Sequence, residues 1–155
     1  MKHVQLSEHF SLAEFTRSDA AKRDAILNIP NEIQIRSMGY LCDTVLELVR
    51  RHFARPVIVL SGFRSPELNA SVGGRPKSQH MRGEAADIMV AGVPHWQVFE
   101  FIAGGLVFDQ LIAERLREDD DCAGWIHVST VAGKKRQEAI SYLGDNKYVS
   151  GLRFV

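Results

Sequence analysis

Two stretches of the sequence combine residue types that bind divalent metal ions. Residues 78–87, SQHMRGEAAD, place His80 seven positions before Asp87, and residues 125–129, WIHVS, hold His127 in a strand-like alternation. Two imidazoles and one carboxylate suit a catalytic zinc, which leaves a fourth position open for water. The same spacing also occurs in ordinary loops and strands, where a histidine is simply half-buried and hydrogen-bonded.

An arginine follows a short apolar run that predicts a strand. The run is PVIVL at residues 56–60, and its β-branched composition indicates a buried strand. Ser65 and Pro66 then provide the N-cap and first position of a helix that should end at Gly73-Gly74. Arg64 would therefore be held rigidly between a strand and a helix, where its local sequence is equally compatible with a surface ion pair.

The order of these segments resembles that of a known family. SGFRSP at 61–66, SQH at 78–80, GEAADI at 83–88 and GWIHVS at 124–129 are similar to motifs of the zinc D-Ala-D-Ala carboxypeptidases and related cell-wall endopeptidases. The resemblance is greatest to the single-domain members found in phages and bacterial genomes, and it runs from residue 6 to 129. It implies a zinc peptidase that acts on peptidoglycan peptides.

The resemblance also implies roles for particular residues. Zinc held by His80, Asp87 and His127 would activate a water molecule and polarise the peptide carbonyl. Arg64 matches the family's arginine, which meets the substrate near the zinc and could bind a carboxylate or stabilise charge on the carbonyl oxygen. Ser78 matches a serine near the substrate, although a hydroxyl that caps a turn would explain it as well.

The general base is the point at which the sequence departs from the family. Related enzymes often carry Glu or Asp three residues before the last histidine ligand, where this chain has Gly124. Two other carboxylates are candidates: Glu114, at the end of a neighbouring strand, and Asp121, in an acidic loop. We favour Glu114, because partial burial raises a carboxyl pKa toward neutrality, whereas a solvated aspartate keeps its low pKa.

Apolar periodicity predicts two helices in the first third of the chain. Residues 11–14, SLAE, form a capping box between two phenylalanines, so a short helix should end at 16–18 and lead into a polar connection reaching Asn28. Pro30 suits the first turn of a second, longer helix. The core-facing side of that helix is predicted from apolar residues spaced three and four apart: Met38, Leu41, Val45 and Leu48.

The second half of the chain is typical of strands. Strands are expected over 87–90, 107–114, 125–129 and 138–142, with a helix from Pro94 to Gly105, a solvated turn at 118–121 and a hairpin turn at 133–136. His95, at the start of that helix, is not expected to bind metal. Together the elements predict an α+β fold: an antiparallel sheet with helices mainly on one side and the zinc site on its open face.

Composition limits the classes of function. At 155 residues the chain should form one domain, residues 1–155, with a core that needs no disulfides. Lys plus Arg and Asp plus Glu number 19 each, which argues against nucleic-acid and membrane partners. The cations at 134–136 are interpreted as a solvated turn, with attraction to anionic wall polymers as the alternative. Cys42 is expected to be a buried thiol.

Three functions agree with these features. The first is a zinc peptidase, either carboxypeptidase or endopeptidase, that cuts peptidoglycan stem peptides. The second is a non-catalytic zinc-containing module that binds the wall or belongs to a phage particle, and the third is a cytoplasmic D-Ala-D-Ala dipeptidase. Residues 1–8 lack the apolar core of a secretion signal, so we expect a monomer made in the cytoplasm, which acts on the wall if released as a phage lysin or carried in a virion.

Overall fold

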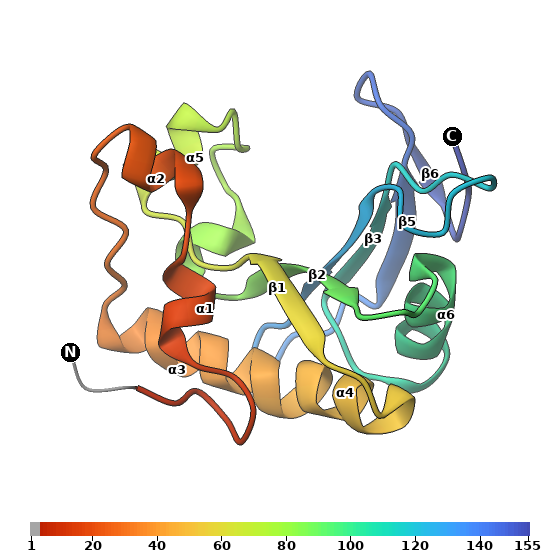
Figure 1. Cartoon of the computed structure of the whole chain (residues 1–155), viewed down its shortest axis with the longest axis horizontal. Coiled ribbons are helices and arrows are strands. Elements are labelled where there is room, and N and C mark those ends of the chain that lie inside the picture. Colours follow the sequence, from red (N-terminus) through yellow and green to blue (C-terminus); the bar gives the residue numbers. More distant parts are fainter. Residues whose placement is uncertain (1–3) are drawn as a thin grey trace.

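A mixed sheet of six strands forms the centre of the molecule. The structure is a computed structural model and describes residues 4–155. The strands lie side by side in the order β1-β2-β4-β3-β5-β6 (Figure 1). Their bounds are β1 Val57–Ser61, β2 Ala85–Val90, β3 Gln110–Glu114, β4 Trp125–Ser129, β5 Glu138–Tyr142 and β6 Tyr148–Ser150.

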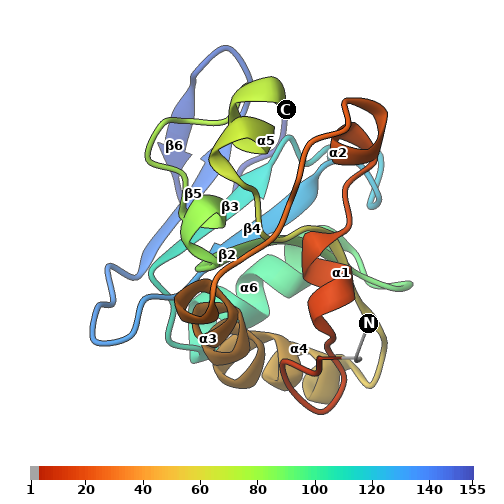
Figure 2. The ribbon, with the colours of Figure 1, turned by 90° about the vertical axis from the view of Figure 1, so that its left-hand side faces the viewer.

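Helices pack mainly on one face of this sheet, as predicted for the α+β fold. A long helix runs beneath the sheet in Figure 1 and consists of α3 (Glu32–Leu41), the π-helical turn η1 (Cys42–Leu46) and α4 (Glu47–Phe53). Helix α6 (His95–Gly105) covers the same face. The short helices α1 (Leu12–Thr16), α2 (Asp19–Arg23) and α5 (Pro66–Ser71) lie beyond β1, as Figure 2 also shows. The 3₁₀ turn η2 (Gln79–Arg82) precedes β2.

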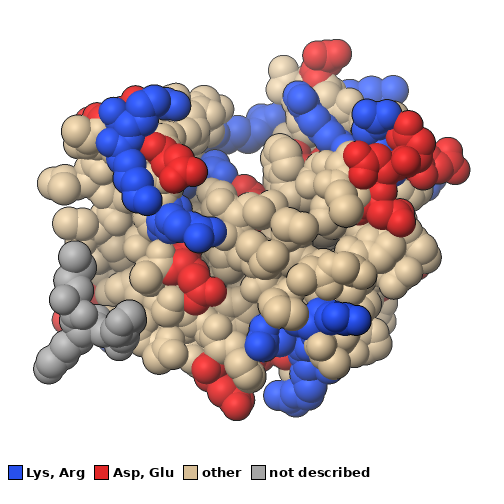
Figure 3. Space-filling model, in the orientation of Figure 1, with Lys and Arg blue, Asp and Glu red and all other residues tan. Residues whose placement is uncertain are grey.

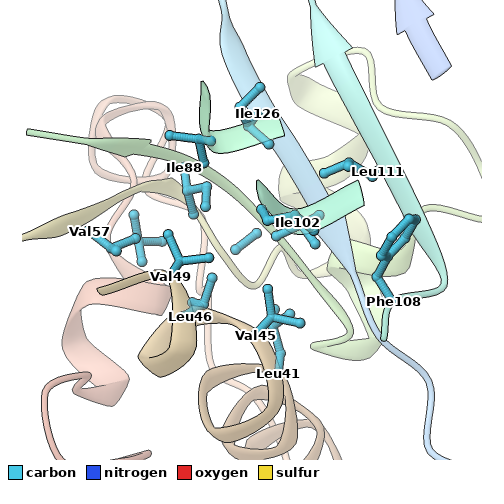
Figure 4. Packing of buried hydrophobic residues seen from close by; sticks show 14 of the residues in the cluster. Leu41, Val45, Leu46, Val49, Val57, Ile88, Ile102, Phe108, Leu111 and Ile126 are labelled. Atoms are coloured by element: carbon cyan, nitrogen blue, oxygen red, sulfur yellow. The ribbon is translucent and has the colours of Figure 1, made fainter. Parts of the chain in front are cut away.

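The core fills the space between these helices and the sheet. Figure 4 shows apolar side chains of the long helix and α6 directed at those of the strands. Burial of each such side chain stabilises the fold by about 1.5–3 kcal/mol, so this layer fixes which face of the sheet is left open. The largest contributions come from fully buried residues, among them Leu41, Leu46, Ile88, Ile102, Phe108, Leu111 and Ile126.

The first helix agrees with its predicted caps. The carboxylate of Glu14 accepts the backbone N–H of Ser11 at 2.8 Å, and the flanking Phe10 and Phe15 are both buried. The connection that follows was expected to lack a helix, but it contains α2. The hydroxyl of Ser18 accepts the N–H of Ala21 and thus starts a helix too short to be recognised by its periodicity.

The long helix begins later than predicted. Its N-cap is Asn31, whose side chain accepts the N–H of Gln34 at 3.0 Å, so Pro30 lies before the helix rather than in its first turn. The core-facing stripe also changes at η1, because a π turn holds more residues than an α turn. Beyond it, Leu46 and Val49 are fully buried, while the predicted Leu48 is only half-buried.

Two predictions about the sheet are wrong. Strand β1 forms the sheet's edge, where Ile58 and Leu60 are exposed, instead of being buried on both sides. The turn at 133–136 does not close a hairpin, because β5 pairs with β3, in parallel, and not with β4. The guanidinium of Arg136 binds the buried Asp109 carboxylate at 2.7 Å. This ion pair holds the segment between β4 and β5 against the start of β3.

Two smaller findings complete the description. Both cysteines are free, and Cys42 is buried as predicted. In the part of the chain that the structure covers, every helix is too short or too polar to cross a membrane. The expectation about a secretion signal concerns a segment that begins at residues 1–3, outside the described residues.

Candidate metal centre

The structure brings His80, Asp87 and His127 together on the open face of the sheet. Asp87 on β2 and His127 on β4 are directly paired across the two strands, so their side chains project from the same face, which we call the metal face. His80 reaches them from η2. One ligand atom from each residue lies within 4.8 Å of the other two, and all three side chains are buried.

Local structure orients the imidazole of His80. Its Nδ1 lies 2.7 Å from the carbonyl oxygen of Gly62, so this nitrogen carries the proton and donates it to that carbonyl. The other ring nitrogen, Nε2, lies 3.3 Å from Asp87 Oδ1. Gly83 ends η2 with φ +70, and a Cβ there would lie 2.4 Å from the Gln34 carbonyl oxygen. The glycine thus permits the sharp return from His80 to β2.

The donor set fits a zinc ion. His127 Nδ1 lies 2.9 Å from Asp87 Oδ1 and His80 Nε2 lies 3.3 Å from the same oxygen, so one nitrogen of each imidazole lies beside that carboxylate. Zinc bonds of about 2.0–2.2 Å in tetrahedral geometry place neighbouring ligand atoms about 3.3 Å apart. The observed separations are close to this value, and the carbonyl contact on His80 Nδ1 is the kind of outer contact that fixes a metal-binding imidazole.

Arg64 contacts a predicted metal ligand. Its Nη2 donates to Asp87 Oδ2 at 2.9 Å, and its Nε donates to the Ser61 hydroxyl at 2.9 Å. The guanidinium thus binds one carboxylate oxygen and leaves the other, Oδ1, for the metal. Burial alone would raise the pKa of the Asp87 carboxyl. The charges and hydrogen bonds of His80 and His127 outweigh burial and hold that pKa well below its usual range.

Glu114 lies on the metal face at the end of β3. Its strand partners are Trp125 on β4 and Tyr142 on β5, and it stands two residues beyond Ile112, the partner of His127. Burial raises the pKa of the Glu114 carboxyl above its ordinary value of 4.5, and the nearby charge of His127 opposes that shift. A half-buried carboxylate with a raised pKa is a better proton acceptor than a fully solvated one.

The comparison with known proteins agrees with this arrangement. A family model described as Peptidase M15 matches residues 8–129, more than three quarters of the chain. The chain belongs to the Peptidase M15 family. Among curated proteins no match was found. The family match ends at Ser129, so it includes the three residues of the metal cluster and excludes β5 and β6.

In this Peptidase M15 chain, the structure separates the two candidate bases. Asp121 is exposed, and its backbone carbonyl accepts the N–H of His95 at the start of α6, the helix that covers the opposite face of the sheet. The carboxylate of Glu114 instead shares the metal face with His127. This arrangement favours Glu114, whose role as the base stays a prediction. His95 is buried at that helix start, apart from the metal cluster.

Gly124 cannot carry the carboxylate that the family resemblance leads one to expect at this position. Its φ is +76, and a Cβ there would lie 2.0 Å from the Glu114 carbonyl oxygen. The close approach of the two backbones, which only glycine allows, brings the end of β3 against the start of β4. Gly124 therefore lies directly against Glu114, the candidate base on the neighbouring strand.

One residue beside the site was predicted from the sequence, and others were not. Ser78 lies directly before η2, so it stands near His80 as expected, and its role toward substrate stays a prediction. Beside it, the side chain of Gln79 donates to Asp109 at 3.0 Å and so joins the pair of Asp109 and Arg136. The alternation in residues 138–142 could have indicated Tyr142 as a neighbour of Glu114, but only if the parallel pairing of β5 with β3 had been known.

Proposed function

We propose that this member of the Peptidase M15 family is a zinc metallopeptidase that hydrolyses a peptide bond in peptidoglycan stem peptides. The observation that supports the proposal most strongly is the convergence of His80, Asp87 and His127, each of which offers one ligand atom within 4.8 Å of the other two. These residues would hold the zinc ion, which when bound would supply the Lewis acid that acidifies water and polarises the carbonyl.

The protein's own residues would carry the proton and orient the site. Glu114 would take a proton from the attacking water and return it to the leaving amine. Arg64 would keep Asp87 ionised and correctly oriented, since it already donates a hydrogen bond to that carboxylate. The contact with Asp87 supports a positioning role for Arg64; direct contact with substrate, as the family resemblance implies, requires another of its N–H groups.

The proposal extends to the type of peptidase and its place of action. We expect a single-domain, phage-like enzyme, either carboxypeptidase or endopeptidase, that acts as a monomer on the cell wall and binds neither nucleic acid nor membrane. The equal numbers of acidic and basic residues support the last point. A cytoplasmic D-Ala-D-Ala dipeptidase would use the same metal cluster and differ only in substrate.

A non-catalytic zinc module is the second candidate, and Gly124 favours it. Where related enzymes carry a carboxylate, this chain has a glycine with positive φ. If Glu114 does not replace that carboxylate, the chain would bind zinc without cutting a peptide.

One experiment separates these functions. Purified peptidoglycan peptides are digested with the zinc-loaded protein, with and without a chelator, and the products are analysed by mass spectrometry. We expect a single type of bond to be cut, only without chelator. His80→Ala and His127→Ala should lose both zinc, measured by elemental analysis, and hydrolysis. Full zinc occupancy in both variants would refute the ligand assignment, and zinc binding without any product would support the non-catalytic module.

A further inference from the structure

Two tyrosines extend the metal face beyond Glu114. Tyr142 on β5 is the strand partner of Glu114, and Tyr148 on β6 is the partner of Tyr142, so all three side chains project from the same face. The tyrosine rings are 4.8 Å apart between centroids. Both tyrosines lie outside the region matched by the family model, which ends at residue 129.

An arginine from the opposite side of the site reaches these rings. Arg75 lies between α5 and η2, yet its Nη2 donates to the Tyr148 hydroxyl at 3.2 Å, and its guanidinium carbon lies 5.4 Å from the centre of the Tyr148 ring. Its backbone is fixed: the carbonyl oxygen accepts hydrogen bonds from the buried Asn69 side chain and from the N–H of Ser78, both at 3.0 Å. The guanidinium is thus presented from an anchored position.

A second arginine lies at the other tyrosine. The guanidinium carbon of Arg115 is 5.6 Å from the centre of the Tyr142 ring, and the Arg115 N–H donates to the Tyr142 carbonyl at 2.9 Å. Within residues 4–155, neither Arg75 nor Arg115 lies within 4.0 Å of a carboxylate, although five other arginines do. Two guanidiniums beside aromatic rings are therefore available to an external anion.

The surface is concave between the two parts of the molecule that the contact of Arg75 with Tyr148 joins. Figure 3 shows that the molecule is hollowed between the part that carries α2 and α5 and the part that carries β5 and β6, with cationic atoms at this hollow. A guanidinium that already donates to a tyrosine keeps further N–H groups in a planar fork, which matches a carboxylate. The Tyr148 oxygen accepts from Arg75, so its own O–H remains free to donate to the same anion.

We propose that Arg75, Arg115, Tyr142 and Tyr148 form a subsite that binds an internal carboxylate of the peptide substrate. The proposal rests on the proposed peptidase function and names a substrate feature. Strand spacing of about 4.8 Å places β5 and β6 about 10–15 Å from the His127 strand, which is three to four residues of extended peptide. If only the C-terminal residue were released, its carboxylate would lie too close to the cleaved bond to reach this subsite. The subsite therefore suits the side chain of an acidic residue within the stem peptide.

The test measures binding separately from cleavage. Zinc-loaded Glu114→Gln protein, which should cut at least about 10²-fold more slowly, is titrated by calorimetry with a synthetic stem peptide that has a free internal carboxylate. Two further versions of the peptide are amidated at that carboxylate or at the C-terminus. We expect the internal amide to bind roughly 10- to 100-fold more weakly, as for a lost charge-assisted hydrogen bond, and the C-terminal amide to bind almost unchanged.

Matched variants identify the residues. Arg75→Gln in the same background should remove the preference for the internal acid without weakening the binding of its amide, and Tyr148→Phe should reduce the preference several-fold. Arg36→Gln, a change of an exposed arginine on α3, should have no effect. The subsite would be overturned if the peptide with the free internal carboxylate and its internal amide bound equally well. It would also be overturned if Arg75→Gln weakened the binding of both peptides equally, or if neither peptide bound. Absence of hydrolysis by the wild type would instead refute the peptidase.

Discussion

Replacement of Glu114 with glutamine tests the proposed chemistry most directly. Glutamine keeps the size of the side chain on the metal face but cannot take a proton. A positioned general base contributes about 10²–10⁴-fold to rate, so kcat for the cleaved stem peptide should fall by at least about 10²-fold. Zinc content should stay near one per chain, because Glu114 is not among the three converging ligand residues.

The dependence of rate on pH provides a second measure of the same residue. Burial raises the pKa of the Glu114 carboxyl above 4.5, so the ionised base should be lost as the pH falls through a value above the ordinary one. In the wild type, kcat/KM should therefore fall about tenfold per pH unit below that pKa. The residual activity of Glu114→Gln should lack this dependence over the range in which zinc content, measured at each pH, is constant.

The stability of the variant distinguishes a catalytic role from a structural one. A carboxyl whose pKa is raised by folding stabilises the folded state at low pH, and this contribution is lost as the pH rises through the folded-state pKa. Glutamine has no ionised form to disfavour, so the melting temperature of Glu114→Gln at pH 7 should equal or exceed that of the wild type. Glu118→Gln, a change in the exposed acidic loop, is the matched control and should alter neither rate nor melting temperature.

Two results would refute the assignment of Glu114. Activity of Glu114→Gln within about threefold of the wild type would exclude it as the base, since that loss is far below the range for a general base. Simultaneous loss of zinc and activity would make it part of the metal site instead. A large loss in Asp121→Asn, with Glu114→Gln unaffected, would move the base to the loop.

Three further changes test other contacts of the site. Arg64→Lys should lower kcat/KM or zinc affinity by about 10- to 100-fold while the fold is retained, because one ammonium cannot reach both Ser61 and Asp87; unchanged zinc affinity and kinetics would leave Arg64 as a surface ion pair. Gly133→Ala should lower the free energy of unfolding in urea by roughly 1–3 kcal/mol, because Gly133 has a positive φ. Gly124→Ala should lower it by more, because Gly124 also has a positive φ and a Cβ there would lie 2.0 Å from a backbone oxygen. Equal losses in the two variants would contradict that close approach. Asn28→Ala should destabilise the fold by about 1–3 kcal/mol, since its side chain bonds the backbone of Thr16, Phe63 and Ser65, whereas the exposed Gln97→Ala should be neutral.

Much of the site could be predicted because its signals are local in sequence. Period-two alternation places His127 on a strand face, Ser65 and Pro66 start a helix directly after Arg64, and His80 and Asp87 lie in one motif. Each signal depends on neighbours within a few residues. The α+β fold and the metal cluster of His80, Asp87 and His127 could be inferred from such signals and from the resemblance to the family.

The helix boundaries show where local signals compete. Pro30 and Asn31 are both acceptable at a helix start, and the hydrogen bond from Gln34 to the Asn31 side chain decides between them. The core-facing side of the long helix follows a 3.6-residue period only up to η1. A π turn is not marked by composition, so the burial of Leu46 and Val49 depends on packing against the sheet.

Only the tertiary structure decided how the strands after β4 are placed. A strand at residues 138–142 can pair with β4 through a hairpin or cross to β3, and the sequence pattern is the same for both. The ion pair between Arg136 and Asp109 accompanies the second arrangement, which sets Tyr142 beside Glu114 and lets Arg75 contact Tyr148, 73 residues away. The sequence alone therefore determined which residues could bind a metal. The folded chain decided which carboxylate, tyrosines and arginines surround it, because those contacts join segments with no local signal in common.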